Sequence, residues 1–299
     1  MKIKELELLD ISNEEYHAQQ SRSEHYYSSS QLKDILKDPE LFYQKYIAQT
    51  LEREKKAVFD IGTYFHTAIL EPHLLEEECK VWHGGRRSGK AWKEFQEEHE
   101  GKVIITSSEE EQAKTLIKGI EESPLCLEHI NDPEAKAELS LFLTLLGVRC
   151  KVRFDLIKLT KEESWIGDLK STTGSVKGAW DLRQKVDGFS YDLSAAFYVD
   201  MVNEYIKRNN LPYAPVENFY LYFSSKTYPV AKRWTMSKRS LAVGRKKYQT
   251  ALKEILKYEK QDWEFYDEEG SLDPMPWTET EWCPEASKEN KKDELDDLL

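Results

Sequence analysis

Residues 148–170 read VRCKVRFDLIKLTKEESWIGDLK, and the predicted fold is built around them. Apolar and polar residues alternate over much of residues 148–157, as they do in a half-buried strand. Residues 158–164 are polar and typical of a turn, and residues 165–170 are typical of a second short strand. We therefore expect a β-hairpin in this stretch.

Three side chains on this hairpin have useful chemistry. Asp168 and Lys170 are two residues apart in a strand, so both point to the same face, and hairpin pairing brings Asp155 beside them. Carboxylates hold Mg²⁺, a bound metal lowers the pKa of its water, and a lysine can orient that water or offset charge on the phosphorane. The pattern favours phosphodiester hydrolysis, although a surface hairpin with an Asp–Lys ion pair has the same spacing.

The composition is typical of a soluble globular protein. The chain has 299 residues, 39% hydrophobic and 33% charged, and is long enough to bury a sizeable core. No apolar run approaches the roughly 20 residues that span a bilayer, and the N-terminus lacks an apolar signal core. We expect a cytoplasmic protein without membrane contact.

The absence of two cofactor-binding motifs and the net charge of the chain restrict the cofactors and the kind of DNA binding that we expect. The four cysteines are scattered without a CxxC pair, which suits a reducing cytoplasm and argues against an iron–sulfur cluster or a zinc site. No GxxxxGK[ST] pattern occurs, so we expect no ATP. The net charge of −12 argues against a bulk nucleic-acid binder. A nuclease, however, can confine its basic residues to one channel.

We expect one catalytic domain, residues 26–285, preceded by a partly ordered N-terminal arm, residues 1–25, and followed by an acidic tail, residues 286–299. The tail ends DELDDLL and is either a docking peptide or a solubilising segment. Periodicity predicts helices over residues 31–36, 59–70, 107–120 and 237–260 and strands over residues 137–145, 218–223 and 228–236. Ser107 or Ser108 is expected to cap the third of these helices. Residues 80–102 are expected to be a loop that becomes helical from Ala91, and Gly62 is expected to allow close helix packing.

Five stretches carry a family resemblance, and they read, in order, YYSSSQLKDILKDPELFYQKY, FDIGTYFHTAILEP, AELSLFLTLLGVRCKVRFDLI, IGDLKSTT and YDLSAAFYVDM. In them the chain resembles the RecE-type (exodeoxyribonuclease VIII-like) branch of the PD-(D/E)XK nucleases, in particular a phage-encoded group. The resemblance extends from Tyr26 to about Trp282. It implies an α/β fold, the PD-(D/E)XK nuclease fold, with a central mixed β-sheet flanked by helices.

The resemblance also implies a function. Members of this group are Mg²⁺-dependent exonucleases that degrade double-stranded DNA ends 5′ to 3′ and leave 3′ single-stranded tails for homologous recombination. They work beside a single-strand annealing protein of the RecT type. Several relatives form rings, so we expect a homo-oligomer, a trimer or a tetramer, in the cytoplasm of a bacterial host. The rival interpretations are a structure-specific endonuclease or nickase and a non-catalytic DNA-end-binding scaffold.

The same resemblance implies further site residues. His66, in the segment GTYFH, matches a metal ligand, although a lone helical histidine more often packs; imidazole suits Mn²⁺ better than Mg²⁺, so Mn²⁺ should be tolerated. The backbone carbonyl of Leu169 is a further expected metal ligand, with Asp155 and Asp168. Glu138 matches an acidic position and would join Asp155, Asp168 and Lys170 in catalysis, by holding a second metal through water or by orienting the attacking water.

DNA contacts are expected on the helix after the hairpin. Tyr191, Ser194 and Tyr198 follow i, i+3 and i+7 spacing and share one helical face, which also suits core packing. Tyr198 matches a family tyrosine, whereas Ser194 stands where relatives have a longer glutamine. The Thr172 hydroxyl, just beyond the DxK motif, can contact a phosphate.

A second DNA contact is expected in the loop at residues 80–102. Arg86, Arg87 and Lys90 form the densest basic cluster in the sequence. They either grip phosphates or belong to a solvated loop.

Overall fold

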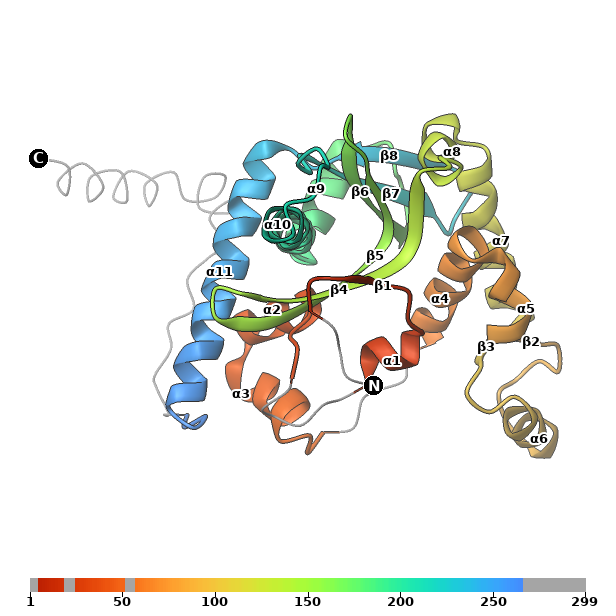
Figure 1. Ribbon diagram of the computed structural model, residues 1–299. Helices are drawn as coiled ribbons and strands as arrows, with labels where there is room; N and C mark the ends of the chain where they lie inside the picture. Colours follow the sequence, from red (N-terminus) through yellow and green to blue (C-terminus); the bar gives the residue numbers. More distant parts are fainter. Residues whose placement is uncertain (1–4, 19–24, 52–56, 266–299) are drawn as a thin grey trace, which may run out of the picture. The chain divides into compact units, whose positions relative to one another are not determined.

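The computed structural model describes residues 5–18, 25–51 and 57–265 (Figure 1). The chain divides into two units, Met1–Trp263 and Glu264–Leu299, and of the second only residues 264 and 265 are described. The expected acidic tail, residues 286–299, therefore lies outside the described residues. Among the described helices, none is long and apolar enough to cross a membrane.

A mixed sheet of six strands, in the order β1-β4-β5-β6-β7-β8, forms the centre of the first unit. The strands are β1 (Leu8–Leu9), β4 (Ala135–Leu145), β5 (Val148–Leu159), β6 (Ser164–Thr172), β7 (Asn218–Ser225) and β8 (Ala231–Thr235). Strands β6 and β7 run parallel, and the other neighbours run antiparallel. The predicted α/β fold with a mixed sheet is confirmed.

Turn chemistry positions the long β4–β5 hairpin. Leu145 pairs with Val148, which leaves Leu146 and Gly147 as a two-residue connection. Both connecting residues have positive φ, 50° and 86°, as a type I′ turn requires, and this turn matches the right-handed twist of the strands. The predicted hairpin of β5 and β6 is confirmed as well, with residues 160–163 as its connection.

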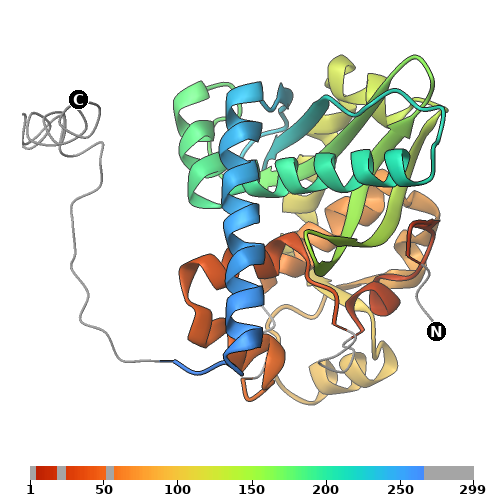
Figure 2. The ribbon, with the colours of Figure 1, turned by 60° about the vertical axis from the view of Figure 1, so that its left-hand side comes forward.

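Helices cover both faces of the sheet (Figures 1 and 2). One face packs against α4 (Ala57–Leu70), α7 (Ser107–Glu121) and α8 (Pro124–Ile130). The other packs against α10 (Tyr191–Arg208), with α9 (Ala179–Gly188) next to it, and α11 (Lys238–Lys260) and α2 (Ser29–Lys37) lie beyond α10. The short elements are α1 (Asn13–His17), α3 (Pro39–Phe42), a π-helical turn (Tyr43–Ile47), a 3₁₀ turn (Pro72–Leu74), α5 (Leu75–Glu78) and α6 (Lys90–Glu98).

A hydrophobic core joins α4, α7 and α8 to the sheet. Its fully buried members include Phe65 of α4, Leu116 of α7, and Trp165 and Leu169 of β6. Burying such a side chain contributes about 1.5–3 kcal/mol, so this core fixes α4 against β6, the strand that carries the DxK motif.

The structure corrects three expectations. The loop expected from residue 80 begins as a strand instead, because β2 (Cys79–Trp82) pairs in parallel with β3 (Val103–Thr106), whereas the helix expected from Ala91 is confirmed as α6 between them. Gly62 does not serve close packing, since a Cβ built there meets nothing within 4 Å. The helix expected to be capped by Ser107 or Ser108 is capped by Thr106, whose hydroxyl and Glu109 form a capping box.

Candidate active site

The candidate site lies where β5 and β6 separate. Leu156 and Gly167 are the last pair in their ladder, and Asp155 and Asp168 are the next residues on the two strands. Beyond this pair the backbone N–H of Leu169 has no strand partner on the β5 side, and it donates instead to Asp155 Oδ2 at 2.6 Å. Asp155 therefore replaces a ladder hydrogen bond, and this satisfies the backbone at the opening.

Lys170 forms a short ion pair inside the opening. Its Nζ lies 2.5 Å from Asp168 Oδ2 and donates to the Leu169 carbonyl at 3.1 Å. Burial opposes the ammonium charge, but Asp168 and Asp155 outweigh it, so the pKa of Lys170 is raised. Burial also raises the pKa of Asp168, against the pull of Lys170. Lys170 is therefore an ammonium at neutral pH.

His66 reaches the opening between β5 and β6 from α4, a helix of the layer that packs on the sheet. The buried side chains of Ile61 and Phe65 hold this helix on the sheet. His66 Nε2 then lies 3.1 Å from the Leu169 carbonyl oxygen, and Nδ1 lies 3.6 Å from Asp155 Oδ2. Imidazole, carboxylate and backbone carbonyl thus converge on one side of β6.

Glu138 faces Asp155 from β4. The ladder is paired on both sides of Glu138 but not at Glu138 itself, which has a left-handed backbone, φ 55°. Such a conformation costs of order 1–3 kcal/mol for a residue other than glycine, so the surrounding ladder holds it in place. Arg153 Nε lies 2.5 Å from Glu138 Oε2, yet burial and the Asp155 carboxylate raise the pKa of Glu138.

These side chains fit a divalent metal ion. Among the described residues, His66, Glu138 and Asp155 form a group whose ligand atoms all lie within 4.8 Å of one another. The Asp155 carboxylate repels that of Glu138, so a bound cation would relieve their repulsion. Oxygen ligands suit Mg²⁺ and Mn²⁺, and the imidazole favours the transition metal. Asp168 is not part of this group, and its Oδ2 is paired with the Lys170 ammonium.

Tyr191, at the start of α10, forms a wall of the site. The Nζ of Lys170 lies 5.5 Å from the centre of its ring, and the Nζ of Lys33, from α2, lies 5.4 Å away. Burial and the Lys170 charge lower the pKa of Lys33 to about 8. Sequence reasoning missed Lys33, because nothing in the local pattern of α2 indicates that this helix faces the DxK strand.

Tyr198 packs against other aromatic side chains and, unlike Tyr191, does not line the candidate site. Its ring meets Phe154 and Phe219 edge-on, with centroids 5.7 and 6.1 Å away. Burial raises its pKa well above the usual value, and its hydroxyl interacts with Ser29 of α2. Ser194 lies between the two tyrosines on α10 and is half-buried. The helical face predicted for DNA contact therefore packs at Tyr198 and borders the site at Tyr191.

The hydroxyl predicted to contact a phosphate is engaged within the protein. The Lys185 ammonium of α9 donates to Thr172 Oγ1 and, at 2.8 Å, to the Thr173 carbonyl. Lys185 is a second cation that sequence reasoning missed, since the contact joins β6 to a helix after an irregular segment. It places a positive charge at the end of the DxK strand.

The predicted basic cluster does not form one patch. Arg87 turns inward, where it bonds Glu109 at 2.6 Å and the Ile104 carbonyl at 2.9 Å. Arg86 is exposed, and Lys90 is 88% exposed and pairs with Glu94 across one turn of α6. Arg87 is thus a structural link between β3 and α7, because the capping carboxylate of α7 attracts it.

Comparisons with known proteins concern the family and the fold. A family model described as "PDDEXK-like domain of unknown function (DUF3799)" matches residues 28–265. A crystal structure of a candidate exonuclease from Eubacterium rectale is similar over 92% of this chain and 99% of its own, with 16% identity and a TM-score of 0.61. A second structure, of SSO0001, covers 64% of this chain and 86% of its own at 15% identity, with a TM-score of 0.26. No curated protein matches.

The fold and the DxK strand pair define a member of the PD-(D/E)XK nuclease superfamily. Within it, the chain belongs to the PDDEXK-like family DUF3799, whose model matches most of its length.

Proposed function

We propose that the protein is a Mg²⁺-dependent exonuclease that degrades double-stranded DNA from its ends. The observation that carries this proposal is the convergence of Asp155, Asp168 and Lys170 at the opening between β5 and β6, with His66 against the same strand. Carboxylates, a carbonyl and a permanent ammonium on one strand pair are the groups that phosphodiester hydrolysis needs.

The residues have distinct parts in this reaction. His66, Asp155 and the Leu169 carbonyl would hold the metal, which when bound polarises the phosphate and acidifies water. The Lys170 ammonium, fixed by Asp168, orients the attacking water and offsets negative charge on the phosphorane. Glu138, whose raised pKa makes it a better proton acceptor than an ordinary glutamate, is placed to orient that water.

The biological setting is part of the proposal. The five ordered motifs and their likeness to the RecE-type branch support 5′-to-3′ polarity, 3′ single-stranded products and a part in phage-type homologous recombination. The same likeness supports a RecT-type annealing partner, a homo-oligomeric ring and a place in the cytoplasm of a bacterial host, encoded by a phage or prophage.

A linear duplex labelled separately at its 5′ and 3′ ends tests the activity. With Mg²⁺, we expect early release of the 5′ label as mononucleotide, while the 3′ label stays on long strands. Early release of the 3′ label would reverse the polarity, and internal fragments without release of either label would contradict an exonuclease.

A further inference from the structure

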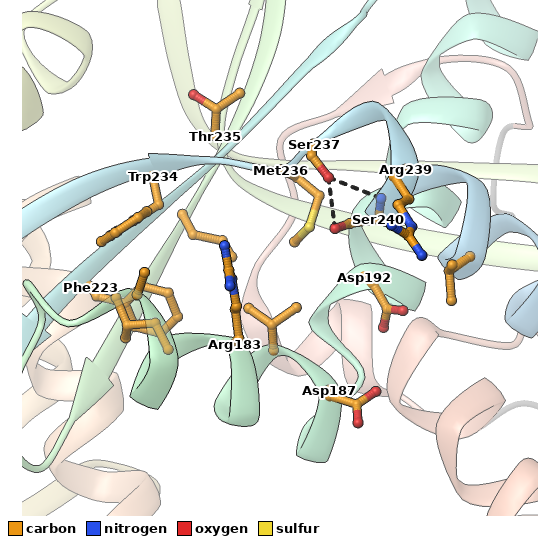
Figure 3. Close-up of a pocket in the computed structure, with 15 residues that line it drawn as sticks. Arg183, Asp187, Asp192, Phe223, Trp234, Thr235, Met236, Ser237, Arg239 and Ser240 are labelled. Atoms are coloured by element: carbon orange, nitrogen blue, oxygen red, sulfur yellow. Dashed lines mark hydrogen bonds between the residues drawn. The ribbon is translucent and has the colours of Figure 1, made fainter. Parts of the chain in front are cut away.

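A cavity of about 460 Å³ lies beside the candidate site, between α9, β7, β8 and the first turn of α11 (Figure 3). Its size falls within the usual range of small-molecule sites. The lining residues that matter here are Phe223, Trp234, Arg183 and Arg239. None of them belongs to the set of residues that the hydrolytic reaction needs.

The cavity is lined by β7, the strand next to the one that carries the Asp168–Lys170 ion pair. Leu221 and Phe223, which line it, are the β7 register partners of Asp168 and Lys170. Paired residues of neighbouring strands point to the same face, so the cavity opens on the face that carries the ion pair. The Phe223 ring also lies 6.1 Å from the ring of Tyr191, the wall of the candidate site. Phe223 thus separates the two spaces.

The apolar part of the cavity suits a flat ring. The half-buried indole of Trp234 is held by a hydrogen bond from its Nε1 to the Val176 carbonyl at 3.1 Å, while Phe223, only 1% exposed, closes the cavity towards the sheet. Aromatic side chains that are fixed in this way give stacking surfaces for nucleobases, each worth about 1–3 kcal/mol.

The polar part of the cavity suits an anion. Arg183, which points from α9 into the cavity in Figure 3, and Arg239 have no ion-pair or hydrogen-bond partner among the described residues. The two acidic lining residues are already engaged, because Lys247 pairs with Asp192 at 2.9 Å and with Asp187 at 3.4 Å. The N-terminus of the 23-residue helix α11 adds partial positive charge at this wall.

We propose that the cavity binds one nucleotide of the DNA strand undergoing cleavage, with its base against Trp234 and its phosphate at Arg183 and Arg239. This inference rests on the proposed function. A nucleotide held here, one strand from Lys170, would fix the position of the neighbouring phosphodiester in the active site. It would also explain how an acidic protein holds its substrate strand at few points.

Calorimetric titration of the full chain with dAMP, and separately with deoxyribose 5-phosphate, tests the site without added metal. We expect dAMP to bind at least about tenfold more tightly, because only dAMP has a base to stack. The Arg183→Ala/Arg239→Ala double variant should weaken dAMP binding at least about tenfold. Lys238→Ala, which removes a neighbouring charge from the same turn of α11 outside the cavity lining, should change it less than about twofold.

Two results would overturn the proposal: no dAMP binding at millimolar concentration, or equal binding by the wild type and the double arginine variant. The Lys170→Ala variant separates this proposal from the proposed function. It should bind dAMP as the wild type does, whether or not it hydrolyses DNA. Retained hydrolysis in Lys170→Ala would reject the catalytic centre, while the dAMP titration alone decides the cavity.

Discussion

Replacing Lys170 tests the proposed chemistry directly, because its ammonium is paired with Asp168 and stays charged. We expect Lys170→Ala to lower the rate of DNA hydrolysis at least about 10²-fold, the scale for losing a transition-state charge stabiliser. Initial rates with saturating Mg²⁺ measure the effect, and Lys161→Ala in the exposed turn is the control. Near-normal turnover with an unchanged melting temperature would remove Lys170 from the mechanism.

His66 should act through the metal. Because its imidazole lies 3.6 Å from Asp155 and 3.1 Å from the Leu169 carbonyl, we expect His66→Ala to raise the Mg²⁺ concentration needed for half-maximal activity. Mn²⁺ should restore part of the rate at lower concentration. His73→Ala, an exposed histidine just beyond the same helix, is the control. An unchanged metal titration would show that His66 only packs.

The buried His129 should make the free energy of unfolding depend on pH. Its ring is buried, stacks on Trp165 at 4.2 Å, and has Nδ1 2.7 Å from the Tyr222 hydroxyl. Burial and Arg233 lower its pKa from 6.5 to about 4. The unfolded chain therefore binds the proton more readily between these values, so this contribution to stability is present above pH 6.5 and lost as the pH falls towards 4.

Urea unfolding at pH 7.5 and pH 5.0 measures this contribution. We expect the wild type to lose about 2 kcal/mol more than His129→Phe over this interval, since one pKa unit corresponds to about 1.4 kcal/mol. The carboxylates of the active site titrate in both proteins, so the difference between the proteins isolates His129. If the two proteins lose the same free energy of unfolding, the His129 ring must be in contact with solvent.

Local spacing predicted Asp155, Asp168 and Lys170 because a hairpin converts spacing directly into proximity. It could not predict Lys33 or Lys185, whose positions depend on helices that pack from distant parts of the chain. The left-handed backbone of Glu138 was also hidden, because its strand shows an ordinary alternating pattern. The features that could not be predicted from the sequence are thus those created by tertiary packing.

At the scale of elements, α10 and α11 pack closely only because residue 244 is glycine. A Cβ built on Gly244 would overlap the backbone carbonyl of Asp192. We expect Gly244→Ala to lower the free energy of unfolding by about 2 kcal/mol, because overpacking typically costs 1–3 kcal/mol and outweighs the gain in helix propensity.

Gly62→Ala is the matched control, measured by the same denaturant unfolding. It also lies inside a helix, but a Cβ there meets nothing within 4 Å. It should therefore stabilise the protein by up to about 1 kcal/mol. If both substitutions shift stability in the same direction, close packing at Gly244 does not limit the α10–α11 contact.

The sequence predicted the helix α6 but not the two strands on either side of it, β2 and β3. These strands are four residues each and pair in parallel, so neither shows a long alternating run and no short turn joins them. Trp82 contacts Trp92 and Phe95 of α6, with ring centroids 5.5 and 5.1 Å away. These aromatic contacts, rather than local propensity, hold the segment together.

At the scale of the whole molecule, the net charge of −12 is repulsive to DNA, so the placement of individual basic residues matters for the proposed function. Lys33, Lys170 and Lys185 lie around the DxK strand, and Arg183 and Arg239 line the adjacent cavity. These five basic residues therefore lie beside the strand on which the proposed reaction would take place. The composition predicts a net negative charge, whereas only the fold shows which basic residues lie near the DxK strand.

Assembly of the chain into a ring would decide which forms of DNA it can degrade. If the chain forms a ring that is threaded by DNA, it needs a duplex end, so linear plasmid should be degraded while the closed and the nicked circular forms resist. The nicked form is the sharpest comparison, because it offers a strand end but no duplex end. Light scattering of the purified protein should give three or four times the mass of one chain. Degradation of nicked circles would exclude threading, and rapid cutting of closed circles would favour an endonuclease.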